Sequence, residues 1–155
     1  MSSEEQNTNS RVTYFLFRLS IGVVYFHFGF LKFFPDLSPA EMLASQTIMR
    51  ISGGMFEAYD ALWVLALLEC TIGVIFIFGI WTPLALTIFL FHMAGTFLPL
   101  IVLPELTFKI FPFAPTMEGQ YILKNLVFVA AGLALMLPRI RFGKLSSIRT
   151  SAQTS

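Results

Sequence analysis

The sequence is poor in charged residues and nearly lacks cysteine. Only 12% of its 155 residues are charged, the formal net charge is +1, and there is one cysteine, Cys70. Soluble domains carry roughly a quarter charged residues, so an ordinary soluble domain is excluded. No basic cluster is interleaved with aromatic residues, so no nucleic-acid partner is expected. A single cysteine within an apolar segment excludes an internal disulfide and a C-x-x-C pair.

Long hydrophobic segments make up most of the chain. Hydrophobic residues account for 56% of the sequence, and the mean hydropathy is +0.76. A membrane crossing takes about 20 apolar residues, and backbone groups cannot stay unpaired in lipid, so the spans must be helical. The sequence therefore predicts an all-α integral membrane four-helix bundle, with spans at about 12–34, 61–80, 83–103 and 121–137.

Three regions are expected along the chain. Residues 1–11 form a polar N-terminal tail, residues 12–138 a single transmembrane domain, and residues 139–155 a basic, Ser/Thr-rich C-terminal tail. Proline cannot continue the helical hydrogen-bond ladder, so Pro35 is expected to close the first span and Pro138 the last.

A short interfacial helix is expected between the first two spans. Ser38-Pro39-Ala40-Glu41 has the S-x-x-E spacing of a capping box with proline at the first helical position. The helix would lie flat on the membrane or cap the bundle. One face is expected to be apolar, with Ala40, Leu43, Ala44, Thr47, Ile48 and Ile51, while Glu41, Gln46 and Arg50 point elsewhere.

The other connections differ in length. Trp81-Thr82-Pro83 predicts a tight turn with proline in the first turn of the next helix. Residues 99–118 are punctuated by four prolines and rich in aromatics, so this connection is expected at the membrane interface.

Basic residues predict the orientation. Arg11 precedes the first span, and a group with no acidic residue among them follows the last: Arg139, Arg141, Lys144 and Arg149. Lysine and arginine collect on the cytoplasmic side of inner-membrane proteins. Both termini are therefore expected in the cytoplasm of a multi-pass protein of the bacterial inner membrane.

Six ionisable residues lie within the predicted spans: Arg18, His27, Lys32, Glu69, His92 and Lys124. Such groups are costly in lipid and usually face the bundle interior, which makes each a functional candidate. On the first helix one stripe holds Arg18, Gly22, Tyr25, Gly29 and Lys32, with His27 on the opposite side. Glycines in such a stripe allow a neighbouring backbone to approach.

Two interpretations of these groups stay open. Glu69, the only acid well inside a span, could pair with any of several cations, and Arg18, Glu69 and Lys124 would then lock the helices together as a buried ion-pair network. Alternatively, Tyr25, His92, Glu69 and the lysines form a polar pocket for a quinone head group or another small polar molecule. Haem is disfavoured because His27 and His92 are expected at different depths, and no metal-ligand spacing is present.

Three segments together resemble the DoxX family of small bacterial membrane proteins. They are FRLSIGVVYFHFGFLKFFPDLSPAE, ALLECTIGVIFIFGIWTPLA and GQYILKNLVFVAAGLAL, and the likeness covers about three quarters of the chain. The resemblance implies a four-helix inner-membrane protein, with some relatives linked to quinone-coupled oxidation and others to complexes that handle oxidative or thiol stress. The positions carried over by the match are Arg18, Lys32, Glu69, Lys124 and Asn125.

These observations favour a DoxX-like accessory or anchoring subunit of a quinone-linked redox system. Such a subunit would have no redox centre of its own and would need protein partners in a membrane complex. Its only expected cofactor is a quinone, and at most it would be a quinone-facing subunit of an oxidoreductase. The alternatives are a purely structural subunit of a larger assembly and a small carrier or proton pathway.

Overall fold

The computed structural model describes residues 3–34, 37–38, 41–55 and 57–153 of the chain. Within them it contains four helical segments long and apolar enough to cross a membrane, Thr8–Leu31, Ala58–Phe78, Thr82–Val102 and Met117–Met136. The predicted all-α membrane bundle is confirmed. The long helices are α1 (Ser3–Leu31), α3 (Ala58–Phe78), α4 (Thr82–Gly95) and α7 (Met117–Gln153).

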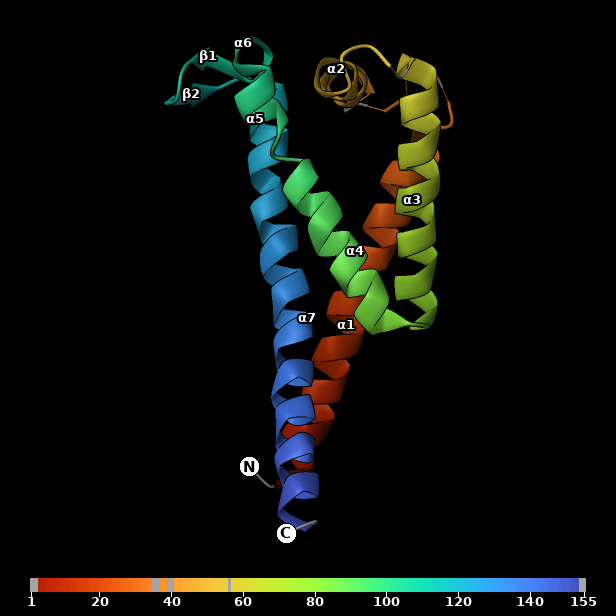
Figure 1. Ribbon diagram of the computed structural model, residues 1–155, viewed down its shortest axis with the longest axis vertical. Helices are drawn as coiled ribbons and strands as arrows, with labels where there is room; N and C mark the ends of the chain where they lie inside the picture. Colours follow the sequence, from red (N-terminus) through yellow and green to blue (C-terminus); the bar gives the residue numbers. More distant parts are fainter. Residues whose placement is uncertain (1–2, 35–36, 39–40, 56, 154–155) are drawn as a thin grey trace.

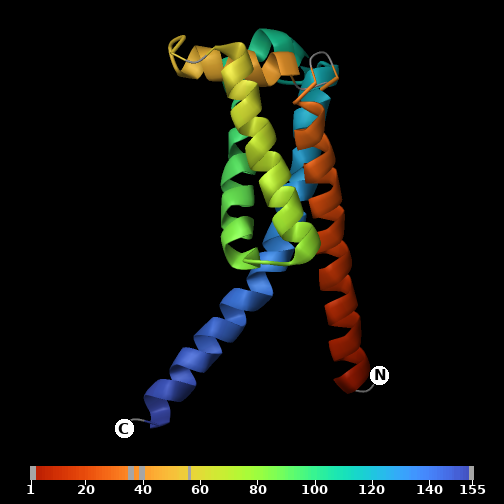
Figure 2. The ribbon, with the colours of Figure 1, turned by 90° about the vertical axis from the view of Figure 1, so that its right-hand side faces the viewer.

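The four long helices are arranged as two packed pairs. Helix α1 lies along α3, and α4 crosses the bundle obliquely to pack on α7, as Figure 1 shows. Both termini lie at the same end, where α1 and α7 extend past the α3–α4 turn. Helix α2 (Glu41–Ile51) lies crosswise at the other end (Figure 2).

Close backbone contact holds α1 against α3. A Cβ atom on Gly22 would lie 2.9 Å from the Ile77 backbone nitrogen, and one on Gly29 would lie 2.8 Å from that of Cys70. Gly73 on α3 faces the Phe26 backbone in the same way, at 2.6 Å. The predicted close approach along the α1 stripe is confirmed.

The turn between α3 and α4 is as short as predicted. Gly79 ends α3 with φ 76°, and its N–H donates to the Ile75 carbonyl, the usual glycine termination of a helix. Trp81 also has a positive φ of 44°, and α4 begins at Thr82 with Pro83 in its first turn.

The third span is not the single helix predicted. Helix α4 ends at Gly95, a turn follows, and α5 (Pro99–Val102) completes the span. Pro99 has no N–H to donate, and its ring would clash with the carbonyl four residues earlier, that of Gly95. Pro99 thus interrupts the helix inside the third span, before its predicted end at residue 103.

The fourth helix begins earlier and continues further than predicted. It starts at Met117, where the Gly119 N–H donates to the Thr116 hydroxyl at 3.2 Å, an N-cap contact. The helix does not stop at Pro138, and residues 139–153 are helical rather than a separate tail. A proline removes one intrahelical hydrogen bond, a loss that a long helix can absorb as a local distortion.

Helix α2 forms where the short helix was predicted, but the Ser38 hydroxyl does not cap it. The Glu41 N–H donates to the Ser38 carbonyl at 3.1 Å, whereas the Ser38 hydroxyl has no hydrogen-bond partner; Pro39 and Ala40 lie outside the described residues. Leu43 and Thr47 are buried as expected, while Ile51 is 54% exposed because it ends the helix.

The 99–118 connection contains structure that the sequence did not predict. Helix α6 (Pro104–Thr107) follows α5, and the strands β1 (Phe108–Ile110) and β2 (Ala114–Pro115) pair antiparallel. This hairpin projects sideways beside the first turn of α7 (Figure 1).

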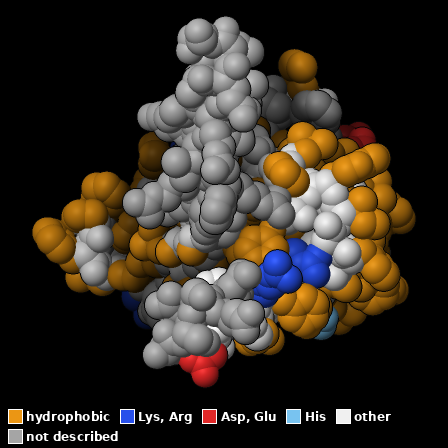
Figure 3. Space-filling model, turned by 90° about the horizontal axis from the view of Figure 1, so that it is seen from below, with side chains coloured by type: hydrophobic (Ala, Val, Ile, Leu, Met, Phe, Trp, Pro, Cys, Tyr) orange, Lys and Arg blue, Asp and Glu red, His pale blue; other side chains and the backbone are white. Residues whose placement is uncertain are grey.

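Two groups of side chains fill the interior. The larger is apolar apart from a tyrosine hydroxyl and joins all four spans: Ile21, Tyr25, Ile72, Phe76, Ala85, Leu86, Phe89, Met93 and Leu135. The smaller joins Leu43 of α2 to Leu103 and to Ile122 of α7. Outside, hydrophobic side chains cover most of the described surface seen from the end with the termini (Figure 3). Such a surface fits a lipid environment.

Candidate functional site: a polar cluster between the helix pairs

Four polar side chains from three helical segments meet inside the bundle. They are Tyr25 of α1, Lys32 in the turn that follows α1, Glu69 of α3 and His92 of α4, and we call them the polar cluster. The Lys32 Nζ lies 2.5 Å from Glu69 Oε2, and their side chains are only 5% and 10% exposed. Of the pairings left open by the sequence, the structure selects this one.

His92 links the ion pair to Tyr25. The Tyr25 hydroxyl lies 2.5 Å from His92 Nδ1, and His92 Nε2 lies 3.7 Å from Glu69 Oε1. The four groups thus form a continuous series from Tyr25 through His92 and Glu69 to Lys32. With the tyrosine donating to Nδ1, a neutral imidazole carries its proton on Nε2. At 3.7 Å the Glu69 oxygen is beyond the usual hydrogen-bond limit, so within the described part of the chain that N–H has no hydrogen bond of normal length.

Packing fixes the orientation of these groups. The Tyr25 ring meets the Phe89 ring edge to face at 4.9 Å, which directs the hydroxyl toward His92. Gly29 brings α1 close to the Glu69 side chain, whose Cβ lies 2.8 Å from a Cβ placed on that glycine. One turn further along, Lys32 reaches the carboxylate and also donates to the Phe28 carbonyl at 3.4 Å.

A second polar contact lies one turn from His92. Asn125 of α7 donates to the Thr96 hydroxyl at 2.9 Å, and that hydroxyl donates to the Met93 carbonyl at 2.7 Å. All four spans therefore contribute polar groups to this half of the bundle. Sequence reasoning selected Asn125 but missed Thr96, although a threonine four residues after His92 lies on the same helix face.

The other predicted candidates lie elsewhere. Arg18 is half-buried near the α3–α4 turn, where its guanidinium contacts Gly79 and stands 5.6 Å from the centre of the Phe15 ring. Lys124 is exposed, with Nζ 3.9 Å from the centre of the Tyr121 ring. Neither pairs with Glu69, so the proposed Arg18–Glu69–Lys124 network does not form. His27 is exposed on the outer side of α1.

Arg18 interacts with the C-terminal end of α3 instead of with Glu69. A cation beside the carbonyl end of a helix is stabilised by the helix dipole, and Arg18 sits at the C-terminus of α3. Lys124 is stabilised by its aromatic partner as a cation–π pair. Both charges are thus accommodated outside the polar cluster, Arg18 by a helix end and Lys124 by an aromatic ring.

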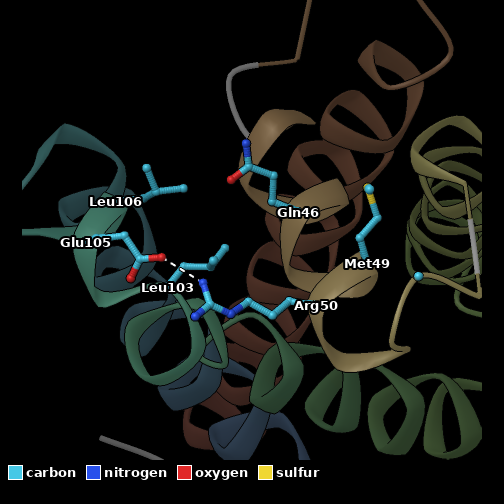
Figure 4. A pocket seen from close by; sticks show the side chains of 7 residues that line it. Gln46, Met49, Arg50, Leu103, Glu105 and Leu106 are labelled. Carbon is cyan, nitrogen blue, oxygen red and sulfur yellow. Dashed lines mark hydrogen bonds and ion pairs between the residues drawn. The ribbon is translucent and has the colours of Figure 1, made fainter.

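A groove of about 430 Å³ opens at the end of the bundle that carries α2. Its walls come from α2 and from the α5–α6 segment, and Figure 4 shows Arg50 reaching across to Glu105 at 2.8 Å. A hydrogen bond from its own backbone N–H, helped by Arg50, lowers the pKa of Glu105. None of the residues lining the groove belongs to the polar cluster.

The described residues contain no group of three or more His, Cys, Asp or Glu side chains that could hold a metal ion. Cys70 is half-buried next to Glu69 in sequence, and its thiol donates to the Phe26 carbonyl at 3.7 Å. The chemistry available at the polar cluster is hydrogen bonding and charge stabilisation. It suits a small molecule with carbonyl or hydroxyl oxygens.

Comparison with family models, with curated proteins and with solved structures finds no match to this chain.

Proposed function

We propose that this protein is a DoxX-like accessory subunit of a quinone-linked redox system in the bacterial inner membrane. In this proposal both termini face the cytoplasm, and the polar cluster binds the quinone head group. The quinone, when bound, carries the electrons and protons of a partner oxidoreductase. The chain itself binds and orients the head group.

The observation that carries the proposal is the geometry of His92. Its Nδ1 is held by Tyr25, while its Nε2 lies 3.7 Å from Glu69 Oε1 and makes no closer polar contact with another described residue. A quinone carbonyl is an acceptor without a proton, so an Nε2–H that lacks a close partner is a suitable donor for it. The neighbouring Lys32–Glu69 pair supplies a second, charged group in a setting of low polarity.

The membrane location also supports a quinone as ligand. Quinones are dissolved in the bilayer, and three of the four cluster residues lie within spans, with Lys32 directly after the first; the outer surfaces of these spans are rich in exposed apolar side chains. A charged pair buried among membrane-spanning helices is costly unless its charges are paired and hydrogen-bonded. Such groups often mark functional sites in membrane proteins.

The two histidines give a matched test. Wild type, His92→Leu and His27→Leu would be purified with their native lipids, and the quinone in each sample would be extracted and measured relative to phospholipid. We expect quinone to be enriched with wild type and with His27→Leu, and to fall about tenfold with His92→Leu, as the loss of one buried hydrogen bond to a ligand requires. Equal quinone content in all three samples would contradict the proposal.

A structural subunit is the second candidate. The Lys32–Glu69 pair and the glycine contacts join α1 to α3 in a way that a purely scaffolding protein would also need. If Glu69→Gln disrupts a native complex on gel filtration, while wild type shows no enrichment of quinone, this second function replaces the first. The opposite pattern, intact assembly with loss of quinone, supports the head-group site.

A further inference from the structure

The β1–β2 hairpin is firmly attached to the bundle at its base. The Thr116 N–H donates to the Thr107 carbonyl at 2.9 Å, and the Thr116 hydroxyl donates to the Leu106 carbonyl at 2.7 Å. Thr107 is fully buried, and a Cβ on Gly119 would collide with its carbonyl oxygen. The hairpin therefore holds a fixed position relative to the first turn of α7.

The tip of this hairpin is apolar and exposed. Ile110 is 66% exposed, Phe111 65% and Phe113 87%. The Phe111 ring meets the Phe108 ring edge to face at 5.2 Å, while Phe113 has the most exposed side chain of the three. In water these three side chains would form an exposed apolar patch, which is unfavourable.

The direction of the hairpin indicates what covers this patch. It projects sideways beyond the outline of the bundle, at the level where α7 begins, and does not cover the other helices (Figure 1). Met117 and Tyr121, in the first turns of α7, are 68% and 46% exposed, so the patch lies beside the lipid-facing surface of that span. Lys109, next to the tip, is exposed and can meet lipid phosphates.

We propose that the hairpin is a membrane-interface anchor, with Ile110, Phe111 and Phe113 inserted into the leaflet opposite the termini. Aromatic side chains favour the boundary between head groups and acyl chains, roughly 5–10 Å deep. A rigid anchor at the start of α7 fixes the depth of that helix in the bilayer. This inference is independent of the proposed quinone function.

Tryptophan fluorescence in lipid vesicles tests the anchor. Trp63 and Trp81 would be replaced by phenylalanine, and Phe113→Trp would place one tryptophan at the tip. The protein would be reconstituted in phosphatidylcholine brominated near the head group or deep in the acyl chain. We expect about twofold stronger quenching by the shallow label and weak quenching by iodide in the water.

Phe91→Trp in the same background is the matched control. Phe91 lies on α4 near the middle of the third span and is 82% exposed, so the deep label should quench it more strongly than the shallow one. Both variants replace exposed aromatics, and unchanged helical circular dichroism would show that they fold. If iodide quenches Trp at position 113 and neither lipid does, the tip faces water or a protein partner, and the anchor is wrong.

Discussion

The α1–α3 and α4–α7 interfaces join similar apolar helices in different ways. Between α1 and α3 the backbones themselves touch, because Gly22, Gly29 and Gly73 leave no side chain between them. Between α4 and α7 the contacts are made by side chains, with Gly132 facing the ends of Phe89 and Leu90. Lipid is as apolar as leucine, so close packing and polar contacts must hold each pair together.

The difference between the two interfaces indicates which helix pair can change its packing. A backbone contact cannot be relieved by a change of rotamer, whereas the ends of side chains can move by a few tenths of an ångström. The α1–α3 pair thus forms a rigid half that holds Lys32 against Glu69, and α4–α7 forms a more adaptable half that carries His92. The polar cluster lies where these halves meet.

The largest effect is expected from removing Glu69. Glu69→Leu leaves the Lys32 charge buried without its partner, which should cost about 3–5 kcal/mol in the free energy of unfolding. Reversible unfolding in mixed micelles would measure it. The double variant Lys32→Met/Glu69→Leu should recover most of the loss, because no charge then remains.

The exposed ion pair gives the control for this prediction. Arg50 and Glu105 have side chains 58% and 54% exposed, so Glu105→Gln should change stability little. Since the folded-state pKa of Glu105 is lowered, its contribution is present at neutral pH and is lost as the pH falls through that pKa. Equal losses from Glu69→Leu and Glu105→Gln would show that the buried pair has no special role.

A smaller loss is expected from Gly73→Ala. Its new Cβ would lie 2.6 Å from the Phe26 backbone nitrogen, so α1 and α3 must separate, at a cost of about 1–3 kcal/mol. Gly95→Ala is the matched control, because nothing lies within 4 Å of a Cβ at that position. Unfolding of both variants in the same micelles would compare them, and equal stability would contradict a backbone contact.

The sequence predicted the α1–α3 interface better than the α4–α7 interface. Arg18, Gly22, Tyr25, Gly29 and Lys32 repeat at helical spacing, so their common face was evident before the partner was known. Glu69 was selected because an acid within a span is rare. Which cation forms the ion pair with Glu69 depends on the tilt of the helices and on where α1 ends. The spacing of residues in the sequence predicts neither.

The misses have two causes. Lys124 and Arg18 were assigned to the interior because charge is costly in lipid, but their long side chains reach an aromatic ring and the carbonyl end of α3 instead. The β1–β2 hairpin depends on the contacts of Thr116 with Thr107 and Leu106 and on the packing of α6 against α7. Such tertiary contacts leave no periodic signal in the sequence.

A weaker coupling is expected between Thr96 and Asn125. Hydrogen bonds between spans contribute about 0.6 kcal/mol on average, since the separated helices find other partners. A double-mutant cycle with Thr96→Val and Asn125→Leu would isolate that amount. Thr87 donates only to the Pro83 carbonyl of its own helix, so the cycle of Thr87→Val with Asn125→Leu should show no coupling. Coupling of equal size in both cycles would argue against a specific α4–α7 contact.

A cost of about 1 kcal/mol, at the low end of the range for overpacking, is expected from Gly132→Ala. A Cβ there would lie 2.8 Å from a Phe89 ring carbon and 3.0 Å from a Leu90 methyl, both of which are the ends of side chains. Shortening a neighbouring side chain should therefore reduce the loss of stability caused by Gly132→Ala. Leu90→Ala should offset part of the cost of Gly132→Ala, as measured by a double-mutant cycle in the same unfolding assay.

The corresponding double-mutant cycle at the α1–α3 interface should show no rescue. Phe26→Ala cannot relieve Gly73→Ala, because the clash is with the Phe26 nitrogen and Cα, which remain after the side chain is removed. Coupling at Gly132 and additivity at Gly73 would establish the difference between a side-chain contact and a backbone contact. If Phe26→Ala rescues Gly73→Ala as well as Leu90→Ala rescues Gly132→Ala, both interfaces adjust alike, and the rigid α1–α3 half that positions Lys32 and Glu69 does not exist.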